Sequence, residues 1–193
     1  MPEEILNNSL QSKVKKFVKK NLKKLIILSL LLILILFSYF FYKDLQKKNE
    51  IKFSEQYMQA SIKFNQKNIE ETKKLLENIV NEKHKFYSPL ALYFIIDNNL
   101  ETDPLKIINF FDTILSISSL NKENINLIKI KKAIFLSSIG NEELIIKTLN
   151  PIINSDSAWR TMAIKLISDY FISKDQKIKA DEYIQLLNNK IKK

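Results

Sequence analysis

The feature that most constrains this chain is an apolar run, residues 25–42, which contains no charged side chain. A helix over these residues is about 27 Å long at 1.5 Å per residue, close to the hydrocarbon thickness of a bilayer. We therefore predict one membrane-spanning helix from Leu25 to Tyr42.

The residues at the end of the run indicate that the segment is retained in the mature protein. A secretory signal ends in small residues at a cleavage site, whereas residues 39–42 are all aromatic. Aromatic side chains at this depth are typical of the boundary between hydrocarbon and headgroups. The sequence also lacks cysteine, which excludes a lipoprotein anchor. We expect the run to be a permanent anchor.

Lysines on the two sides of the run predict its orientation. Residues 13–24 contain seven lysines and no acid, whereas residues 43–52 contain four lysines and two acids. The positive-inside rule then places the tail, residues 1–24, in the cytoplasm. Residues 43–193 would form a domain outside the cytoplasm, in the periplasm of a Gram-negative bacterium.

The tail also has a helical pattern of its own. Leu10, Val14, Phe17, Val18 and Leu25 fall near one helix face, with lysines on the other. Such a basic amphipathic helix can lie on an anionic membrane surface or contact a cytoplasmic partner. We favour the simpler interpretation, in which the lysines only orient the anchor.

The net charge of +10 divides equally, with +5 on residues 1–42 and +5 on residues 43–193. Lysines of the larger part are scattered among acids and form no stripe that would follow a phosphate backbone. We therefore predict no nucleic-acid partner.

After the anchor, apolar residues recur at spacings of three and four, which predicts helices throughout. Breaks are expected at 67–68, at Gly140-Asn141 and near Asp175, and Asp103 is the expected N-cap of a helix that begins with Pro104. The predicted helices form four pairs: 43–65 with 69–82, 88–97 with 104–116, 123–139 with 142–153, and 158–173 with 177–191.

The spacing of the breaks predicts a repeat. Asn141 and Asp175 lie 34 residues apart, the period of tetratricopeptide repeats. Small residues also stand where paired helices would cross closely, followed about a turn later by large apolar ones, as in Ala133 with Leu136 and Ser168 with Phe171. We predict an all-α protein with one transmembrane helix followed by an α-solenoid of about four tetratricopeptide-like helix pairs.

One stretch near the end is more distinctive. The run Ser157-x-Trp159-Arg160-x-x-Ala163-x-x-Leu166 resembles a Ser-x-Trp-Arg-x-x-Ala-x-Glu-Leu run of the ancillary Sec translocon subunit family, membrane-anchored bacterial tetratricopeptide proteins. This chain has Lys165 where the family usually has Glu. The resemblance implies an inner-membrane adaptor whose periplasmic domain helps the Sec translocon to hand exported proteins to chaperones.

Five aromatic and basic residues are candidates for partner contacts or for packing: Trp159, Arg160, Tyr57, Phe64 and Tyr93. A Trp at the start of a repeat helix usually fills the gap to the preceding pair, and the Arg after it usually reaches an acid or a helix end. Aromatic residues on the first helix of a pair can line a concave groove. We favour the packing role for all five.

No pattern in the sequence indicates catalysis. The single histidine, His84, lies in a polar link where we expect it to be solvated, and no cysteine completes a metal site or a nucleophile-base pair. Acidic pairs such as Glu70-Glu71 open predicted helices, where the helix dipole accounts for them. We predict a protein that is not an enzyme and binds no cofactor.

Two functions of different class remain. The array is either a binding module for a peptide or protein at the Sec exit, or a structural tether in another envelope assembly such as division or cytochrome maturation machinery. A groove lined by aromatic and polar residues favours the first function, and a large dry apolar patch on an outer helix face favours the second.

Overall fold

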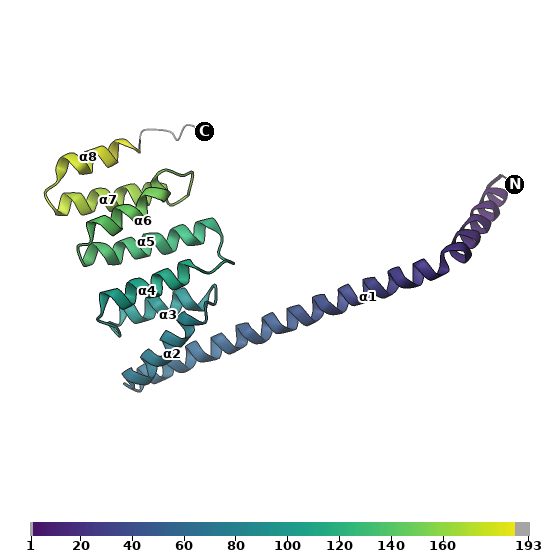
Figure 1. Ribbon diagram of the computed structural model, residues 1–193, viewed down its shortest axis with the longest axis horizontal. Helices are drawn as coiled ribbons and strands as arrows, with labels where there is room; N and C mark the ends of the chain where they lie inside the picture. The colour runs from purple at the N-terminus through teal and green to yellow at the C-terminus, as the bar shows by residue number, and fades with distance from the viewer. Residues whose placement is uncertain (1, 188–193) are drawn as a thin grey trace. The chain divides into compact units, whose positions relative to one another are not determined.

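The computed structural model describes residues 2–187, with the side chains of 2–12 and 14 left out of the description. These residues form eight helices and no strand, which confirms the all-α prediction (Figure 1). The helices are α1 (Pro2–Asn65), α2 (Ile69–Asn81), α3 (Tyr87–Asp97), α4 (Pro104–Leu115), α5 (Lys122–Ser138), α6 (Glu142–Ile153), α7 (Arg160–Ser173) and α8 (Lys177–Gln185).

The chain divides into two compact units, an N-terminal unit of residues 1–52 and a C-terminal unit of residues 53–193. Helix α1 contributes to both, because it continues from the predicted anchor through Asn65. The predicted domain limits at 24/25 and 42/43 therefore fall inside a helix and are not marked by a break in the backbone.

In the N-terminal unit, α1 is long and apolar enough to cross a membrane. The large apolar side chains from Ile26 to Tyr42 are all exposed. The helix is kinked at Asn21, whose backbone angles are φ −114° and ψ 16°, and the bend is visible near the N-terminus in Figure 1. The Asn21 Nδ2 atom donates a hydrogen bond to the Phe17 carbonyl oxygen at 3.1 Å.

The expected breaks in the C-terminal unit are confirmed. Lys67, Gly140 and Asp175 have φ values of 61°, 72° and 58°, the left-handed conformation that ends a helix. Asn68 and Asp103 cap the helices that follow them, by accepting hydrogen bonds from the backbone N–H groups of Glu71 and Leu105. Asn121 and Asn141 cap α5 and α6 in the same way.

Two predicted helix limits need comment. The helix expected to start at residue 158 starts at Arg160, because residues 157–159 form a turn closed by the Arg160 N–H and the Ser157 carbonyl. The last helix was expected to reach residue 191, and α8 ends at Gln185. Residues 188–191 of that prediction lie outside the described residues.

From α2 to α8 each helix packs on the next one along the chain, and α2 also contacts α4, as α5 contacts α7. We take these helices as consecutive pairs. The first helices are residues 53–65 of α1, α3, α5 and α7, and the second helices are α2, α4, α6 and α8. Small residues lie where paired helices cross. Ala60, Thr72, Ala133 and Ser168 have no exposed surface.

The C-terminal unit has two apolar clusters. One gathers buried residues from Phe53 to Ile128, and the other gathers buried residues from Ile130 to Ala180. The change from one cluster to the other falls within α5, between Ile128 and Ile130, and the Phe135 ring of α5 packs on the first cluster, 6.2 Å from the Phe111 ring. Beside these rings the Lys132 ammonium, 9% exposed, pairs with the Asp112 carboxylate at 2.6 Å. Lys132 thus supplies a charge-assisted contact at the junction.

Candidate binding surface

The first helices carry two hollows. One, the α3–α5 hollow, lies between α3 with the turn before it and α5 with the loop before it. Its volume is about 290 Å³ and its lining is largely apolar and aromatic, with an amide and a lysine at the edge. The lining residues are Lys85, Phe86, Pro89, Leu90, Tyr93, Leu120, Asn124, Leu127 and Ile128.

The second, the α5–α7 hollow, lies between α5 and α7 with the turn before it, and has a volume of about 510 Å³. Its apolar lining comes from α5, from the turn before α7 and from α7, and its charged residues come from α7. The lining residues are Ile130, Ile134, Ala158, Trp159, Thr161, Met162, Lys165, Leu166 and Asp169.

The two hollows are neighbours across α5. Leu127 lines the first and Ile134 the second, and residues seven apart in a helix fall on nearly the same face. We call the two hollows together the first-helix surface. Three of its large apolar side chains are exposed to solvent, with exposed fractions of 59% for Phe86, 48% for Ile134 and 50% for Met162. Apolar side chains exposed next to one another in a concave lining are typical of a binding surface.

Charged groups at this surface are mainly basic. The Lys131 ammonium lies 5.5 Å from the centre of the Tyr93 ring, and Lys85 and Lys165 line the hollows, with Asp169 as the acid beside them. The Tyr93 hydroxyl is protonated at neutral pH, as an ordinary tyrosine is, and can donate a hydrogen bond; burial raises its pKa further, to about 12. The surface therefore offers apolar contacts, hydrogen bonds and positive charge together.

The structure places the predicted residues Trp159 and Arg160 in different roles. Trp159 is half-buried, packing on the second apolar cluster with one side while lining the α5–α7 hollow. Arg160 donates to the Ile153 carbonyl through Nε at 2.9 Å and to the Leu186 carbonyl through a terminal nitrogen at 2.7 Å. Because these carbonyls end α6 and follow α8, Arg160 ties two helix ends together.

Polar contacts hold the turn that carries Trp159. The Ser157 hydroxyl donates to the Glu123 carboxylate at 2.8 Å and accepts from the Trp159 N–H at 3.1 Å. It also accepts from the side chain of the buried Asn126 at 3.0 Å. Lys122 pairs with Asp156 at 2.7 Å. These contacts fasten the turn to the start of α5 and so fix one wall of the hollow.

The other candidates divide between packing and surface. The Tyr57 and Phe64 rings contact the Phe94 ring edge to face at 6.0 and 5.2 Å, and both residues are half-buried against the first apolar cluster. They join the end of α1 to α3. Tyr93 is also half-buried against the first apolar cluster, and in addition it lines the α3–α5 hollow.

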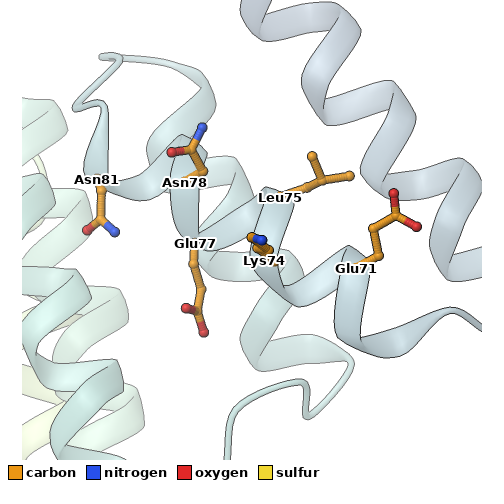
Figure 2. A pocket seen from close by; sticks show the side chains of 6 residues that line it. All are labelled: Glu71, Lys74, Leu75, Glu77, Asn78 and Asn81. Carbon is orange, nitrogen blue, oxygen red and sulfur yellow. The ribbon is translucent and has the colours of Figure 1, made fainter.

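A third hollow lies along α2 and is polar (Figure 2). All six lining residues belong to α2: Glu71, Lys74, Leu75, Glu77, Asn78 and Asn81. Its carboxylates are already paired, since Glu71 binds Lys63 at 3.0 Å and Glu77 binds Lys106 at 2.6 Å. The α2 hollow therefore reflects the solvated face of a helix, and we assign it no role.

The expectation for His84 was wrong. Its ring is half-buried, 4.5 Å from the Phe53 ring, and its Nδ1 atom accepts hydrogen bonds from the backbone N–H groups of Phe86 and Tyr87. The side chain thus caps the start of α3, a role that depends on the fold around the link. Among the described residues no group of three His, Cys, Asp or Glu side chains is placed to hold a metal ion.

Sequence reasoning missed most of the first-helix surface, including Phe86, Ile134 and Met162. A signal was present, because Phe86, Leu90 and Tyr93 recur at spacings of four and three on the helix face opposite to the buried Leu92 and Ile95. A second apolar stripe on a helix predicts a second contact surface, but it does not say which neighbouring helix completes it.

Comparison with known proteins adds no relative to this description. No family model, curated protein or solved structure matches the chain. The functional assignment below therefore rests on the residues and their geometry, together with the resemblance of the run around Trp159.

Proposed function

We propose that this protein is a membrane-anchored adaptor that binds other proteins through the first-helix surface. The observation that supports this most directly is the pair of neighbouring hollows, which combine exposed apolar side chains with lysines and a neutral tyrosine hydroxyl. Such a lining suits an extended peptide whose large side chains enter the two hollows while its backbone crosses α5.

We also propose that the C-terminal unit is a tetratricopeptide-like α-solenoid. In the first and the last helix pair, two residues that are 12 apart in the sequence meet where the paired helices cross. The Thr72 hydroxyl lies 3.5 Å from the Ala60 carbonyl oxygen, and the Ser168 hydroxyl donates to the Ala180 carbonyl at 3.1 Å. Equivalent residues of successive pairs also meet at a separation of 34, as between Glu123 and Ser157.

The partner that we propose is the Sec translocon, with exported proteins or periplasmic chaperones as further partners. This assignment is supported by the resemblance of the Ser157-x-Trp159-Arg160 run and by the apolar N-terminal helix. With the basic tail in the cytoplasm, the first-helix surface would face the periplasm of a bacterial inner membrane. The anchor would then raise the local concentration of this surface near the channel.

The alternative, a structural tether, has less support. It requires a continuous apolar patch on an outer helix face, whereas exposed large apolar residues of the described second helices are scattered, as with Leu105 on α4 and Ile178 on α8. Isolated residues of this kind are normal on protein surfaces.

Site-specific photocrosslinking in native membranes tests the proposal. A photoreactive residue replaces Phe86 or Met162 on the first-helix surface, and the controls carry it at Leu105 or Ile178, which are 70% and 79% exposed and so at least as accessible. We expect crosslinks to Sec channel subunits, chaperones or exported proteins from the first pair alone. Crosslinks to other envelope proteins from the control pair would favour the tether, and crosslinks of neither kind would contradict both functions.

Exchanging the anchor tests whether the membrane span or the C-terminal unit supplies the association with the Sec translocon. Residues 25–42 contain only two small residues, Ser29 and Ser38, so they offer little close packing to another membrane helix. We expect an unrelated apolar span to preserve most of the Sec enrichment, and deletion of residues 121–193 to abolish it. The Sec assignment fails if the full chain is no more enriched than an unrelated single-span protein.

A further inference from the structure

We propose that residues 2–20 of α1 form an arm that lies flat on an anionic lipid surface, with the kink at Asn21 as its joint to the membrane span. The partner is the headgroup layer of the bilayer that holds the anchor. This inference requires the anchor but does not depend on the Sec translocon or on the first-helix surface.

The first observation is the cause of the kink. In an unbroken helix the Phe17 carbonyl would accept only the Asn21 backbone N–H, four residues on. Here the Asn21 side-chain amide donates to this carbonyl at 3.1 Å, and the Asn21 backbone leaves helical geometry. A side chain that competes for the i−4 carbonyl is a recognised cause of helix bending. The bend is therefore encoded at one residue.

The second observation is the position of this residue around the helix. At 100° per residue, Asn21 falls on the same face as Leu10, Val14 and Phe17. Phe17 is 61% exposed and the neighbouring Leu22 is 52% exposed. The joint thus lies within the apolar stripe of the arm, and this stripe has no protein partner at Phe17 that shields it from solvent.

The third observation is charge. Residues 13–24 contain seven lysines without an acid, and Lys15, Lys16, Lys19 and Lys20 lie outside the apolar stripe. A straight helix would carry Lys13 about 18 Å beyond Leu25, farther than the screening length of about 8 to 10 Å at physiological salt. A bend at Asn21 keeps the lysines of the arm near the headgroups. Orientation of the anchor alone would not require this.

Charge and location together select the ligand. Anionic headgroups complement the lysines, while the acyl chains beneath them accept Phe17 and Val18. The anchor begins at Leu25, so the joint is only four residues from the predicted span. A lipid surface is therefore always within reach of the arm, at a concentration that no soluble acidic partner matches.

Spin labels can test this in the full chain, because the sequence contains no cysteine and a single introduced cysteine is labelled alone. Phe17→Cys places a label on the apolar stripe, and Lys19→Cys places the matched control 200° around the helix. Leu31→Cys reports insertion of the span. Each variant is reconstituted in phosphatidylcholine vesicles with and without phosphatidylglycerol, and collision with oxygen and with a water-soluble nickel complex measures label depth.

With phosphatidylglycerol present, we expect the label at 17 to lie about 5 to 10 Å below the headgroup surface and the label at 19 to stay in water. Without the anionic lipid, or at high salt, the label at 17 should move into water. Asn21→Ala, which removes the competing amide, should reduce the depth at 17 in the anionic vesicles.

Three results would overturn the inference while the label at 31 remains in hydrocarbon. The first is that the labels at 17 and 19 both stay in water in the anionic vesicles. The second is that the depth at 17 is the same with and without phosphatidylglycerol, and the third is that Asn21→Ala leaves that depth unchanged. A label at 31 that is exposed to water would instead contradict the anchor itself, and with it this inference, without bearing on the first-helix surface.

Discussion

The N-terminal and C-terminal units use the same apolar side chains in opposite ways. Leu31 and Phe37 of the N-terminal unit are 51% and 70% exposed, whereas Leu149 and Phe171 of the C-terminal unit are 0% and 1% exposed. In residues 25–42 apolar side chains surround the helix, and in α2 they form a single stripe above a charged face. A helix that is apolar on all sides is typical of a membrane span or of the core of a large protein, while a stripe requires only a neighbouring helix.

The largest expected effect compares two exposed leucines, Leu31 on α1 and Leu105 on α4. Leu31→Asp places a charge in the middle of the predicted span, at a cost of about 2.5 to 3.5 kcal/mol on insertion scales. We expect it to lower the membrane-inserted fraction, measured by carbonate extraction. Leu105→Asp, exposed to water near the start of α4, should leave that fraction and the folding of the C-terminal unit unchanged. Equal effects of the two substitutions on the inserted fraction would mean that Leu31 and Leu105 lie in the same environment.

A second pair of variants compares phenylalanines in the two units. Phe171→Ala opens a cavity in the second apolar cluster and should lower the free energy of unfolding by about 3 to 5 kcal/mol. The fragment 47–193 should be soluble and melt cooperatively, so this can be measured by chemical denaturation of the fragment. Phe37→Ala in the full chain should leave the melting temperature of the C-terminal unit unchanged, and a shift there would contradict the independence of the units.

Trp159→Ala should have a smaller effect than Phe171→Ala. Truncating a fully buried tryptophan to alanine costs about 3 to 5 kcal/mol. Because the ring is half-buried, we expect about 2 kcal/mol, with a larger effect on partner capture than on unfolding. Met162→Ala is the control, because it shortens an exposed side chain of the hollow and removes no buried one. Partner capture that survives both changes would exclude the α5–α7 hollow.

A buried acid makes the C-terminal unit sensitive to low pH. The Glu101 carboxylate is 7% exposed, accepts from the Asp103 and Thr102 N–H groups, and pairs with Lys73 and Lys106. The Asp103 N–H and then Lys73 lower its pKa from 4.5 to about 2.

The Glu101 carboxylate therefore binds a proton less tightly in the folded state than in the unfolded state. The ionised carboxylate stabilises the fold above pH 4.5, and this contribution is lost as the pH falls toward 2. We expect Glu101→Gln to lower the free energy of unfolding at pH 7 by about 2 kcal/mol and to flatten its decline between pH 4.5 and 2. Denaturant unfolding at several pH values measures both. An unchanged decline would place the acid sensitivity elsewhere.

The smallest expected effect concerns helix capping. Asn121→Ala removes the side-chain oxygen that accepts the Asn124 N–H at the start of α5, and should cost about 1 kcal/mol. Asn124→Ala, exposed and in the first turn of the same helix, is the control and should change the free energy of unfolding by less than about 0.5 kcal/mol. Equal losses would indicate that the cap contributes little.

Several features were predictable because each depends on one short segment. The spacing of apolar residues placed α2 and α6 within one residue of their observed ends, and Asp103 with Pro104 marked the start of α4. The single glycine, Gly140, lies at the predicted break with φ 72°. Helix periodicity, capping and backbone conformation are local, so the sequence states them directly.

The candidate site was predictable only in part. Tyr93 and Trp159 were recognised as aromatic residues on first helices, but Ile134 and Met162 of the same surface were not. A hollow forms between side chains of different helices, so its lining depends on how those helices cross. Neither the spacing along α5 nor that along α7 contains this information.

By itself, the sequence determined that the chain is helical, where most helices begin and end, and that residues 25–42 are apolar on every side. Only the tertiary structure decided what the polar side chains contact: Glu101 pairs with two lysines, Arg160 reaches two carbonyls, and His84 caps α3. The physical reason is distance along the chain. Apolar burial depends on the face of one helix, whereas a hydrogen bond or ion pair needs two groups within a few ångströms, brought together by packing.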